Sequence, residues 1–400
     1  MQETLSRKNL ILVASMLFGM FFGAGNLIFP VYMGQMAGSH VWPAIVGFIL
    51  TGVGLPLLGV AALGVSRQES LFDLSQNVGR RYGLFFTCAL YLTIGPGFAI
   101  PRCATVSFTV GAEPILQNPS NPWILGLFSL VFFGITLACS FRPSKILTWV
   151  GKVLNPVFLC FLGLLVVKAL LFPMGPIQGG SPEPGYETGA FFTGFQQGYQ
   201  TMDALAGLAF GILVVHVIQD LGIRKPDAVA KNTGYAGAFS CLLMALIYVM
   251  VTIVGAQSRS VLPLCENGGQ ALSLIAEHYF GTTGAILLAV TVTLACLKTS
   301  IGLVTSCSEA FVKMFPKGPS YGVWAVLFSA ASFLLANLGL STILAYSPPV
   351  LVFLYPLAIT LILLALFGRF FHNDRRVYGW VTGCTLPAAF FDLLNNLPPQ

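Results

Sequence analysis

The sequence predicts an all-α polytopic membrane protein, and its composition is the first reason. Of the 400 residues, 56% are hydrophobic and only 8% are charged, and the mean hydropathy is +0.82. Soluble domains carry about 25% charged residues, so this chain has too few to cover a surface that faces water. The apolar runs are continuous, whereas the strands of an outer-membrane barrel alternate in polarity. Helices that cross a bilayer are therefore the expected elements.

The second reason is the length of the apolar segments. A helix needs about 20 predominantly apolar residues to cross a bilayer. Polar connections divide the chain into eleven segments of this kind, and each is taken as one predicted span. The spans are 9–33, 41–65, 83–108, 122–140, 146–172, 191–216, 232–256, 283–311, 321–338, 343–367 and 377–394.

The third reason is the distribution of basic residues, which are enriched in cytoplasmic connections. One set of alternate connections holds fifteen of the twenty Lys and Arg residues, and the opposite set holds only Arg259. We therefore expect a cytoplasmic N-terminus in a multi-pass protein of the cytoplasmic membrane. The fifteen are Arg7, Lys8, Arg67, Arg80, Arg81, Arg142, Lys145, Arg224, Lys225, Lys231, Lys313, Lys317, Arg369, Arg375 and Arg376.

Neither the net charge nor the spacing of the cysteines indicates a further class of function. The net charge of +6 follows from the topology and requires no nucleic-acid partner. The nine cysteines have no metal-ligand spacing; eight lie in apolar spans and Cys265 lies alone in an outer loop. We predict no zinc, no disulfide and no cofactor, and a chain that contacts the lipid bilayer and a small molecule.

Two long connections lie on the outer side. The stretch 173–189 is rich in Gly and Pro and is predicted to be a loop. The stretch 265–281 places apolar residues at helical spacing. It is either an interfacial helix that caps the outer mouth or an outer loop that packs on the bundle. Its apolar residues are Leu272, Ile275, Ala276 and Tyr279.

The first span is interrupted at its centre by "MFFGAGNLIFP", residues 20–30. Two glycines and an asparagine weaken the helix at membrane depth, where freed backbone groups survive only inside protein or beside a wet cavity. Alternatively, Gly19 and Gly23 have the spacing of glycines that let two helices approach closely. The sixth span has a similar polar centre, "YQTMDALAGLAFG" at 199–211, which holds Asp203. The pair of interruptions favours a break over packing.

Interruptions at corresponding places in two halves indicate an inverted-repeat transporter with its site near the midplane. The predicted units are a first five-span repeat over 1–172, an outer loop over 173–190, an inverted repeat over 191–367, and an additional helix and tail over 368–400. Half-helix ends present amides to an anion and carbonyls to a cation, and a zwitterionic amino acid requires both. Asn26 adds a side-chain oxygen as a candidate cation ligand.

Five segments together resemble the branched-chain amino acid:cation symporter family. They are "FFGAGNLIFP" (21–30), "GPGFAIPRCATVSF" (95–108), "TMDALAGLAFGI" (201–212), "LACLKTSIGL" (294–303) and "YPLAITLILL" (355–364). The resemblance implies the amino acid–polyamine–organocation superfamily and the five-plus-five inverted repeat of the leucine transporter fold. It also implies import of leucine, isoleucine and valine, coupled to sodium or protons, and no enzyme activity.

The resemblance also implies where the substrate and the cation bind. Backbone groups at the two breaks would hold the substrate, namely those of Gly23, Ala24, Gly25, Asn26, Thr201, Met202, Asp203 and Ala204. A cation would be bound by carbonyls of Gly19, Phe22 and Cys296 and by the hydroxyls of Thr299 and Ser300, which are oxygen ligands suited to a hard ion. Hydroxyls in an apolar helix more often bond to the carbonyl four residues earlier. An apolar lining for the substrate side chain is expected from Phe21, Ile28, Phe98 and Leu205.

The sequence departs from the family pattern in three ways. Family members usually have twelve spans, whereas eleven are found, and Thr109 stands where an acid is expected. Lys298 stands in "ACLKTS", where a small polar residue is usual. Its ammonium would replace the bound cation, or it is neutral, or it pairs with an acid such as Asp203. Helix geometry directs it about 100° away from Thr299.

Arg102 is a further charge inside a span, which is costly in a bilayer. It is expected either to pair with an acid of an outer gate or to extend to the surface. Both Lys298 and Arg102 are candidates for coupling or for a charge pair.

Functions from other classes fit less well. An intramembrane aspartyl protease would need Asp203 and Asp392 in one site, but neither lies in a glycine-flanked catalytic pattern. A channel would show a repeated pore loop, and none is visible. A non-coupled amino acid exchanger or a membrane amino acid sensor on the same fold remains the alternative.

Overall fold

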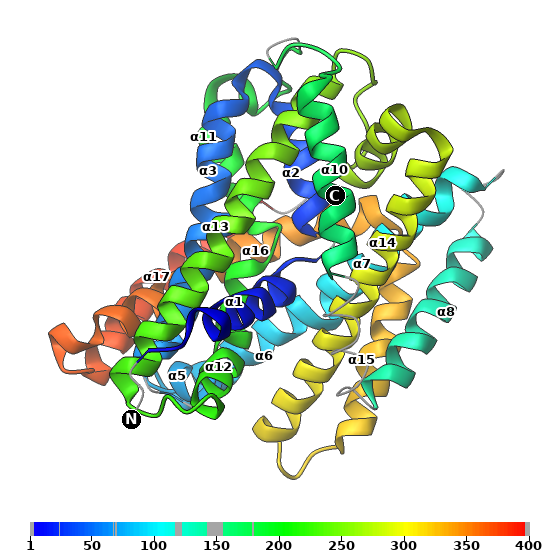
Figure 1. Cartoon of the computed structure of the whole chain (residues 1–400). Helices are drawn as coiled ribbons and strands as arrows, with labels where there is room; N and C mark the ends of the chain where they lie inside the picture. The colour runs from blue at the N-terminus through cyan, green and yellow to red at the C-terminus, as the bar shows by residue number, and fades with distance from the viewer. Residues whose placement is uncertain are drawn as a thin grey trace.

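The computed structural model describes residues 4–23, 25–66, 68, 70–116, 122–141, 155–177 and 180–396, and this part of the chain is helical without strands. The all-α prediction is therefore confirmed (Figure 1). The principal helices are α1 (Arg7–Phe21), α2 (Gly25–Ala37), α3 (Val41–Ile49), α4 (Leu55–Ser66), α5 (Leu71–Ser75), α6 (Arg80–Leu92), α7 (Ala99–Ser107), α8 (Pro122–Ser140), α10 (Asn155–Leu171), α11 (Tyr186–Tyr199), α12 (Asp203–Asp220), α13 (Pro226–Ser258), α14 (Gly268–Met314), α15 (Tyr321–Ala336), α16 (Leu340–Phe367) and α17 (Arg375–Asn395).

Helices overlap each of the eleven predicted spans. Within the described residues, seven helical segments are long and apolar enough to cross a membrane, and the bent pair Tyr186–Gly211 and Leu213–Asp220 raises this number to eight. Leu159–Leu171 and Tyr321–Ala336 are apolar but shorter. The number of eleven crossings stays a prediction. Residues 146–154 of the fifth predicted span lie outside the described part.

Both predicted breaks are present. α1 ends at Phe21, Phe22 is extended with ψ of 97°, and α2 begins at Gly25. α11 ends at Tyr199, and α12 begins at Asp203 after Met202, which has a left-handed conformation with φ of 61°. The first and sixth predicted spans are therefore each two half-helices. Glycines at 23 and 25 remove the side chains that would stabilise a continuous helix.

A third irregularity lies between α6 and α7. Gly95 has the non-helical angles φ −94° and ψ −124°, and Pro96 follows it. Proline cannot donate the next helical hydrogen bond, so the helix changes course here. The kink precedes Arg102 by two turns and sets the direction from which that side chain enters the bundle.

Close backbone packing joins the half-helices to their neighbours. A Cβ built on Gly34 of α2 would collide with the carbonyl oxygen of Thr252 on α13, and one on Gly255 would collide with that of Val31. Beside this pair α11 runs along α3, where Gly47 faces the Phe191 carbonyl in the same way (Figure 1). Small residues at such contacts allow helix backbones to approach closely in a membrane.

The connection 265–281, which is predicted to lie on the outer side, forms a helix. α14 begins at Gly268, where the Asn267 side chain accepts hydrogen bonds from the amides of Gly269 and Gln270 at 3.0 and 3.1 Å. The chain turns sharply at Gly281, whose φ is 62°. The apolar residues of this outer helix are buried, so it packs on the bundle as a helix and not as a loop. They are Leu272, Ile275, Ala276 and Tyr279.

The loop over 173–189 is shorter than predicted, because α11 already begins at Tyr186. Glu183 in this loop accepts a hydrogen bond from Arg259 at 3.0 Å and forms an ion pair with it. The Glu183 amide also donates to the carbonyl of Met36 at 2.8 Å. The loop thus joins the C-terminal ends of α2 and α13.

Replacing Gly34 with alanine should destabilise the protein by about 1–3 kcal/mol, because the added methyl would force α2 away from α13. The melting temperature of the purified protein in detergent measures the effect. Gly134→Ala on α8 is the matched control, since nothing lies within 4 Å of the Cβ it would add. Equal melting temperatures for the two variants would contradict the close α2–α13 contact.

Candidate functional site

A cavity lies where the two broken spans meet. Its volume is about 40 Å³, which is smaller than the about 300–1,000 Å³ of typical small-molecule sites, so a ligand of amino acid size requires the cavity to widen. Six of the eight predicted substrate residues line it. The lining residues are Met20, Phe21, Gly23, Gly25, Asn26, Ile94, Ala99, Arg102, Cys103, Thr201, Met202, Asp203, Ala206, Phe210, Thr299 and Leu303.

The two other predicted substrate residues differ from these. Ala24 lies outside the described residues. Ala204 is fully buried and is not part of the lining, and its carbonyl oxygen would lie 3.4 Å from a Cβ built on Gly59. The first turn of α12 therefore presents Asp203 to the cavity and packs Ala204 against α4.

Asn26 organises the break of the first span. Its Oδ1 accepts a hydrogen bond from the Gly23 amide at 2.9 Å. In a continuous helix that amide would donate to the carbonyl of Gly19. The side chain of Asn26 thus replaces the backbone partner, and the Gly19 carbonyl loses its usual donor.

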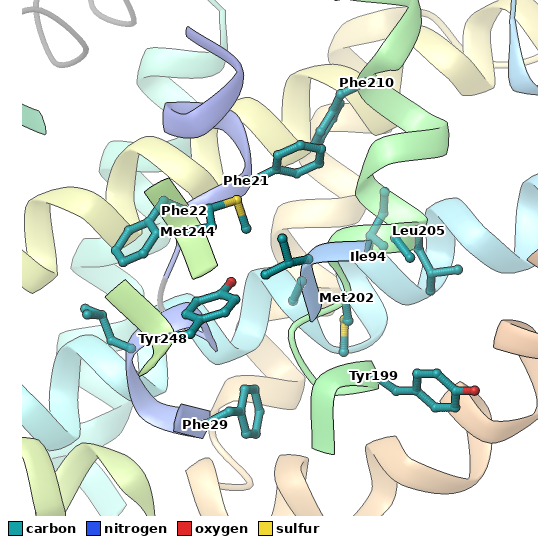
Figure 2. Packing of buried hydrophobic residues seen from close by; sticks show 14 of the residues in the cluster. Phe21, Phe22, Phe29, Ile94, Tyr199, Met202, Leu205, Phe210, Met244 and Tyr248 are labelled. Carbon is teal, nitrogen blue, oxygen red and sulfur yellow. The ribbon is translucent and has the colours of Figure 1, made fainter. Parts of the chain in front are cut away.

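The same side chain connects three helices. The Nδ2 group of Asn26 donates to Asp203 Oδ2 on α12 at 2.6 Å and to the hydroxyl of Tyr248 on α13. Tyr248 in turn donates to Asp203 Oδ2 at 2.9 Å. All three residues are buried. Figure 2 shows Tyr248 near the end of α1 marked by Phe22 and the start of α2 marked by Phe29.

Arg102 completes the break of the sixth span. Its Nη1 donates to the carbonyl oxygen of Gln200 at 2.7 Å, which is one of the carbonyls left free where α11 ends. The guanidinium carbon lies 5.0 Å from the ring centroid of Phe29, a favourable cation–π geometry. Only 4% of Arg102 is exposed, so the expectation that it extends to the surface is wrong. The Ser347 hydroxyl on α16 donates a hydrogen bond to Oε1 of the Gln200 side chain at 2.7 Å.

The residues predicted to bind a cation lie around the end of α1 and the middle of α14. Gly19, Phe22, Cys296 and Ser300 are buried, and Thr299 lines the cavity. The Thr299 hydroxyl donates to the carbonyl of Ala295 at 3.1 Å, as hydroxyls in apolar helices commonly do. The Ser300 hydroxyl has no hydrogen-bond partner within the described part of the chain.

Lys298 is not among the residues that line the cavity. The neighbouring Thr299 does line it, which agrees with the helical geometry that directs these two side chains apart. The carboxylate of Asp203, which we considered as a partner of Lys298, is instead hydrogen-bonded by Asn26 and Tyr248.

The apolar part of the cavity differs from the expected lining. Phe21 is present, but Ile28, Phe98 and Leu205 are not. In Figure 2, Phe21 from α1 and Phe210 from α12 point toward each other. Phe210 lies seven residues after Asp203 and Leu303 four after Thr299, so helical periodicity from the polar residues was a signal that could have found both.

Thr109 lies outside this cavity. It lines a second cavity together with Glu113 and Glu266, which supply two carboxyl groups close to the position where an acid was expected.

The comparison with known proteins identifies the family. Residues 6–399 match the family described as "Branched-chain amino acid transport protein". The branched-chain amino acid permease BrnQ of Lactobacillus delbrueckii subsp. lactis is 50% identical over 399 residues, which cover 100% of this chain and 90% of that protein. BrnQ of Bacillus subtilis is 44% identical over 397 residues, covering 99% and 89%.

Among solved structures, the chain resembles Mhp1, a nucleobase-cation-symport-1 family transporter, in a closed conformation with bromovinylhydantoin bound. The TM-score is 0.62 at 17% identity, and the match covers 97% of this chain and 92% of Mhp1. This likeness concerns the fold alone. The family match spans nearly the whole sequence, and the chain therefore belongs to the branched-chain amino acid transport family.

Proposed function

We propose that this protein imports leucine, isoleucine and valine across the cytoplasmic membrane by alternating access, coupled to sodium or protons. The observation that carries the proposal is the cavity at which both broken helices meet, in a chain of this transport family. The proposed repeats, 1–172 and 191–367, each begin with one of these broken helices. The basic connections favour a cytoplasmic N-terminus.

The proposed substrate site uses the polar and the apolar parts of the cavity. Backbone groups at 23–26 and 201–204 hold the carboxylate and the ammonium, because half-helix ends carry unsatisfied amides and carbonyls. The aliphatic side chain of the substrate packs among Phe21, Ile94 and Phe210. Removal of this side chain from water favours larger branched substrates over glycine or alanine.

The proposed cation site uses the carbonyls of Gly19, Phe22 and Cys296 with the hydroxyls of Thr299 and Ser300. Two observations support it. The Gly23 amide is diverted from the Gly19 carbonyl to Asn26, and the buried Ser300 hydroxyl has no hydrogen-bond partner within the described residues. The Thr299 oxygen donates its proton to Ala295 and keeps its lone pairs for a cation. A proton as the coupling ion, or the Lys298 ammonium in place of sodium, is the alternative.

Purified protein in liposomes should accumulate radiolabelled leucine above its external concentration when an inward sodium or proton gradient is imposed. Uptake is measured in sodium-containing and sodium-free buffers, with and without an ionophore that collapses the proton gradient. Uptake that vanishes without sodium would exclude Lys298 as its substitute. Exchange of internal for external leucine without accumulation would indicate an exchanger. Binding without uptake would indicate a sensor.

Replacing Gly25 with valine should reduce leucine uptake to the background of empty liposomes. A Cβ at this position would lie 2.9 Å from Nη2 of Arg102 and 3.2 Å from Cε2 of Phe29, so the side chain would occupy the cavity. Gly302→Val on α14 is the control, because nothing lies within 4 Å of its added Cβ. Normal uptake by a folded Gly25→Val protein would place the substrate elsewhere.

A further inference from the structure

The cavity contains a buried cation and a buried anion that do not bond to each other. Arg102 and Asp203 both line it and are 4% and 2% exposed. In the described part of the chain, no ion pair joins them. Burying a charge costs several kcal/mol unless a partner of opposite sign compensates it. Two opposite charges in one cavity would therefore be expected to pair directly unless other contacts hold them apart.

Each charge is held by its own set of contacts. The Asp203 carboxylate accepts hydrogen bonds from Asn26 and Tyr248 on α2 and α13. The Arg102 guanidinium donates to the Gln200 carbonyl and lies over the Phe29 ring. Asn26 and Phe29 both lie on α2, and the other contacts come from α13 and from the end of α11; together they hold the two charges at separate positions around the cavity.

The guanidinium of Arg102 has N–H donors that form no hydrogen bond to the described residues. It carries five N–H donors, of which the bond to Gln200 uses one. No other hydrogen bond of this guanidinium joins it to the described residues. Nη2 is the atom nearest to a Cβ built on Gly25, so it lies beside the first residue of α2. The amino end of a helix is itself favourable for an anion, because its first amides have no partner within the helix.

We propose that Arg102 binds the α-carboxylate of the substrate, together with the amino end of α2, while Asp203 faces the α-ammonium. This assignment rests on the proposed function and names the side chain that faces each charged group of the substrate in the same cavity. A guanidinium presents parallel donors that match the two oxygens of a carboxylate. The bound zwitterion compensates both buried charges, so a ligand that lacks either charged group leaves one of them without a counter-charge.

The test compares ligands as well as variants. Binding of L-leucine to the purified protein is measured by competition against radiolabelled leucine, with 3-methylbutylamine as the analogue that lacks the carboxylate. Arg102→Met should weaken leucine binding about 10- to 100-fold, the range for a hydrogen bond to a charged group. The affinity for 3-methylbutylamine should not fall, and it should rise where the substitution removes the cost of leaving the Arg102 charge without a counter-charge. The ratio of the leucine affinity to the 3-methylbutylamine affinity should therefore fall toward one in Arg102→Met. In Arg102→Lys, which keeps a positive charge, the ratio should be intermediate.

Two control variants separate binding from support of the fold. Ser347→Ala removes a different hydrogen bond to Gln200, and Arg259→Met removes an outer arginine that does not line the cavity. Both variants should have the same ratio of leucine to 3-methylbutylamine affinity as the unsubstituted protein. The melting temperature shows whether Arg102→Met is folded. If it is unfolded, the ratio of leucine to 3-methylbutylamine affinity in Arg102→Lys decides whether Arg102 binds the carboxylate.

Two results would overturn the assignment while the proposed function stands. One is unchanged leucine affinity in Arg102→Met. The other is an equal loss for leucine and for 3-methylbutylamine, which would make Arg102 only a support for the end of α11. If the unsubstituted protein binds no leucine, the proposed function itself fails, and the assignment fails with it.

Discussion

The structure depends on satisfying backbone groups that two interrupted helices free at membrane depth. Inside a bilayer no water is available for such groups, so side chains must supply the partners. Asn26 supplies an acceptor for the Gly23 amide, and Arg102 supplies a donor for the Gln200 carbonyl. Both breaks are thus stabilised by polar side chains that line the cavity. The residues that stabilise the two helix breaks are therefore also part of the candidate site.

This arrangement couples the position of one helix to another. Asn26 on α2 contacts Asp203 on α12 and Tyr248 on α13, and close glycine contacts join the C-terminal halves of α2 and α13. A shift of α2 relative to α12 must break a buried hydrogen bond, which leaves a buried polar group unsatisfied at a cost of about 1–3 kcal/mol. In an alternating-access movement, α2, α12 and α13 would have to move together and keep these contacts, or the contacts would have to be replaced by contacts with a ligand.

The cavity combines a charged part and an apolar part. Buried charges of opposite sign disfavour ligands without matching charges, because an uncompensated charge in a dry site is costly. The aromatic and aliphatic walls, Phe21, Ile94, Phe210 and Leu303, disfavour polar side chains for the same reason. A zwitterion with an aliphatic side chain satisfies both parts, which agrees with the family to which the chain belongs.

The sequence alone determined the helical class, the two breaks and most of the residues around them. Hydropathy and weak helix formers act locally, and a bilayer permits few other backbone conformations. Residues 23, 25, 26 and 201–203 could therefore be predicted to meet. The partners of these residues were decided only by the tertiary structure. Arg102 and Gln200 are 98 residues apart, and Tyr248 and Asp203 are 45 apart. Their contacts depend on how a kinked α7 and a continuous α13 pack against the breaks, which no local pattern encodes.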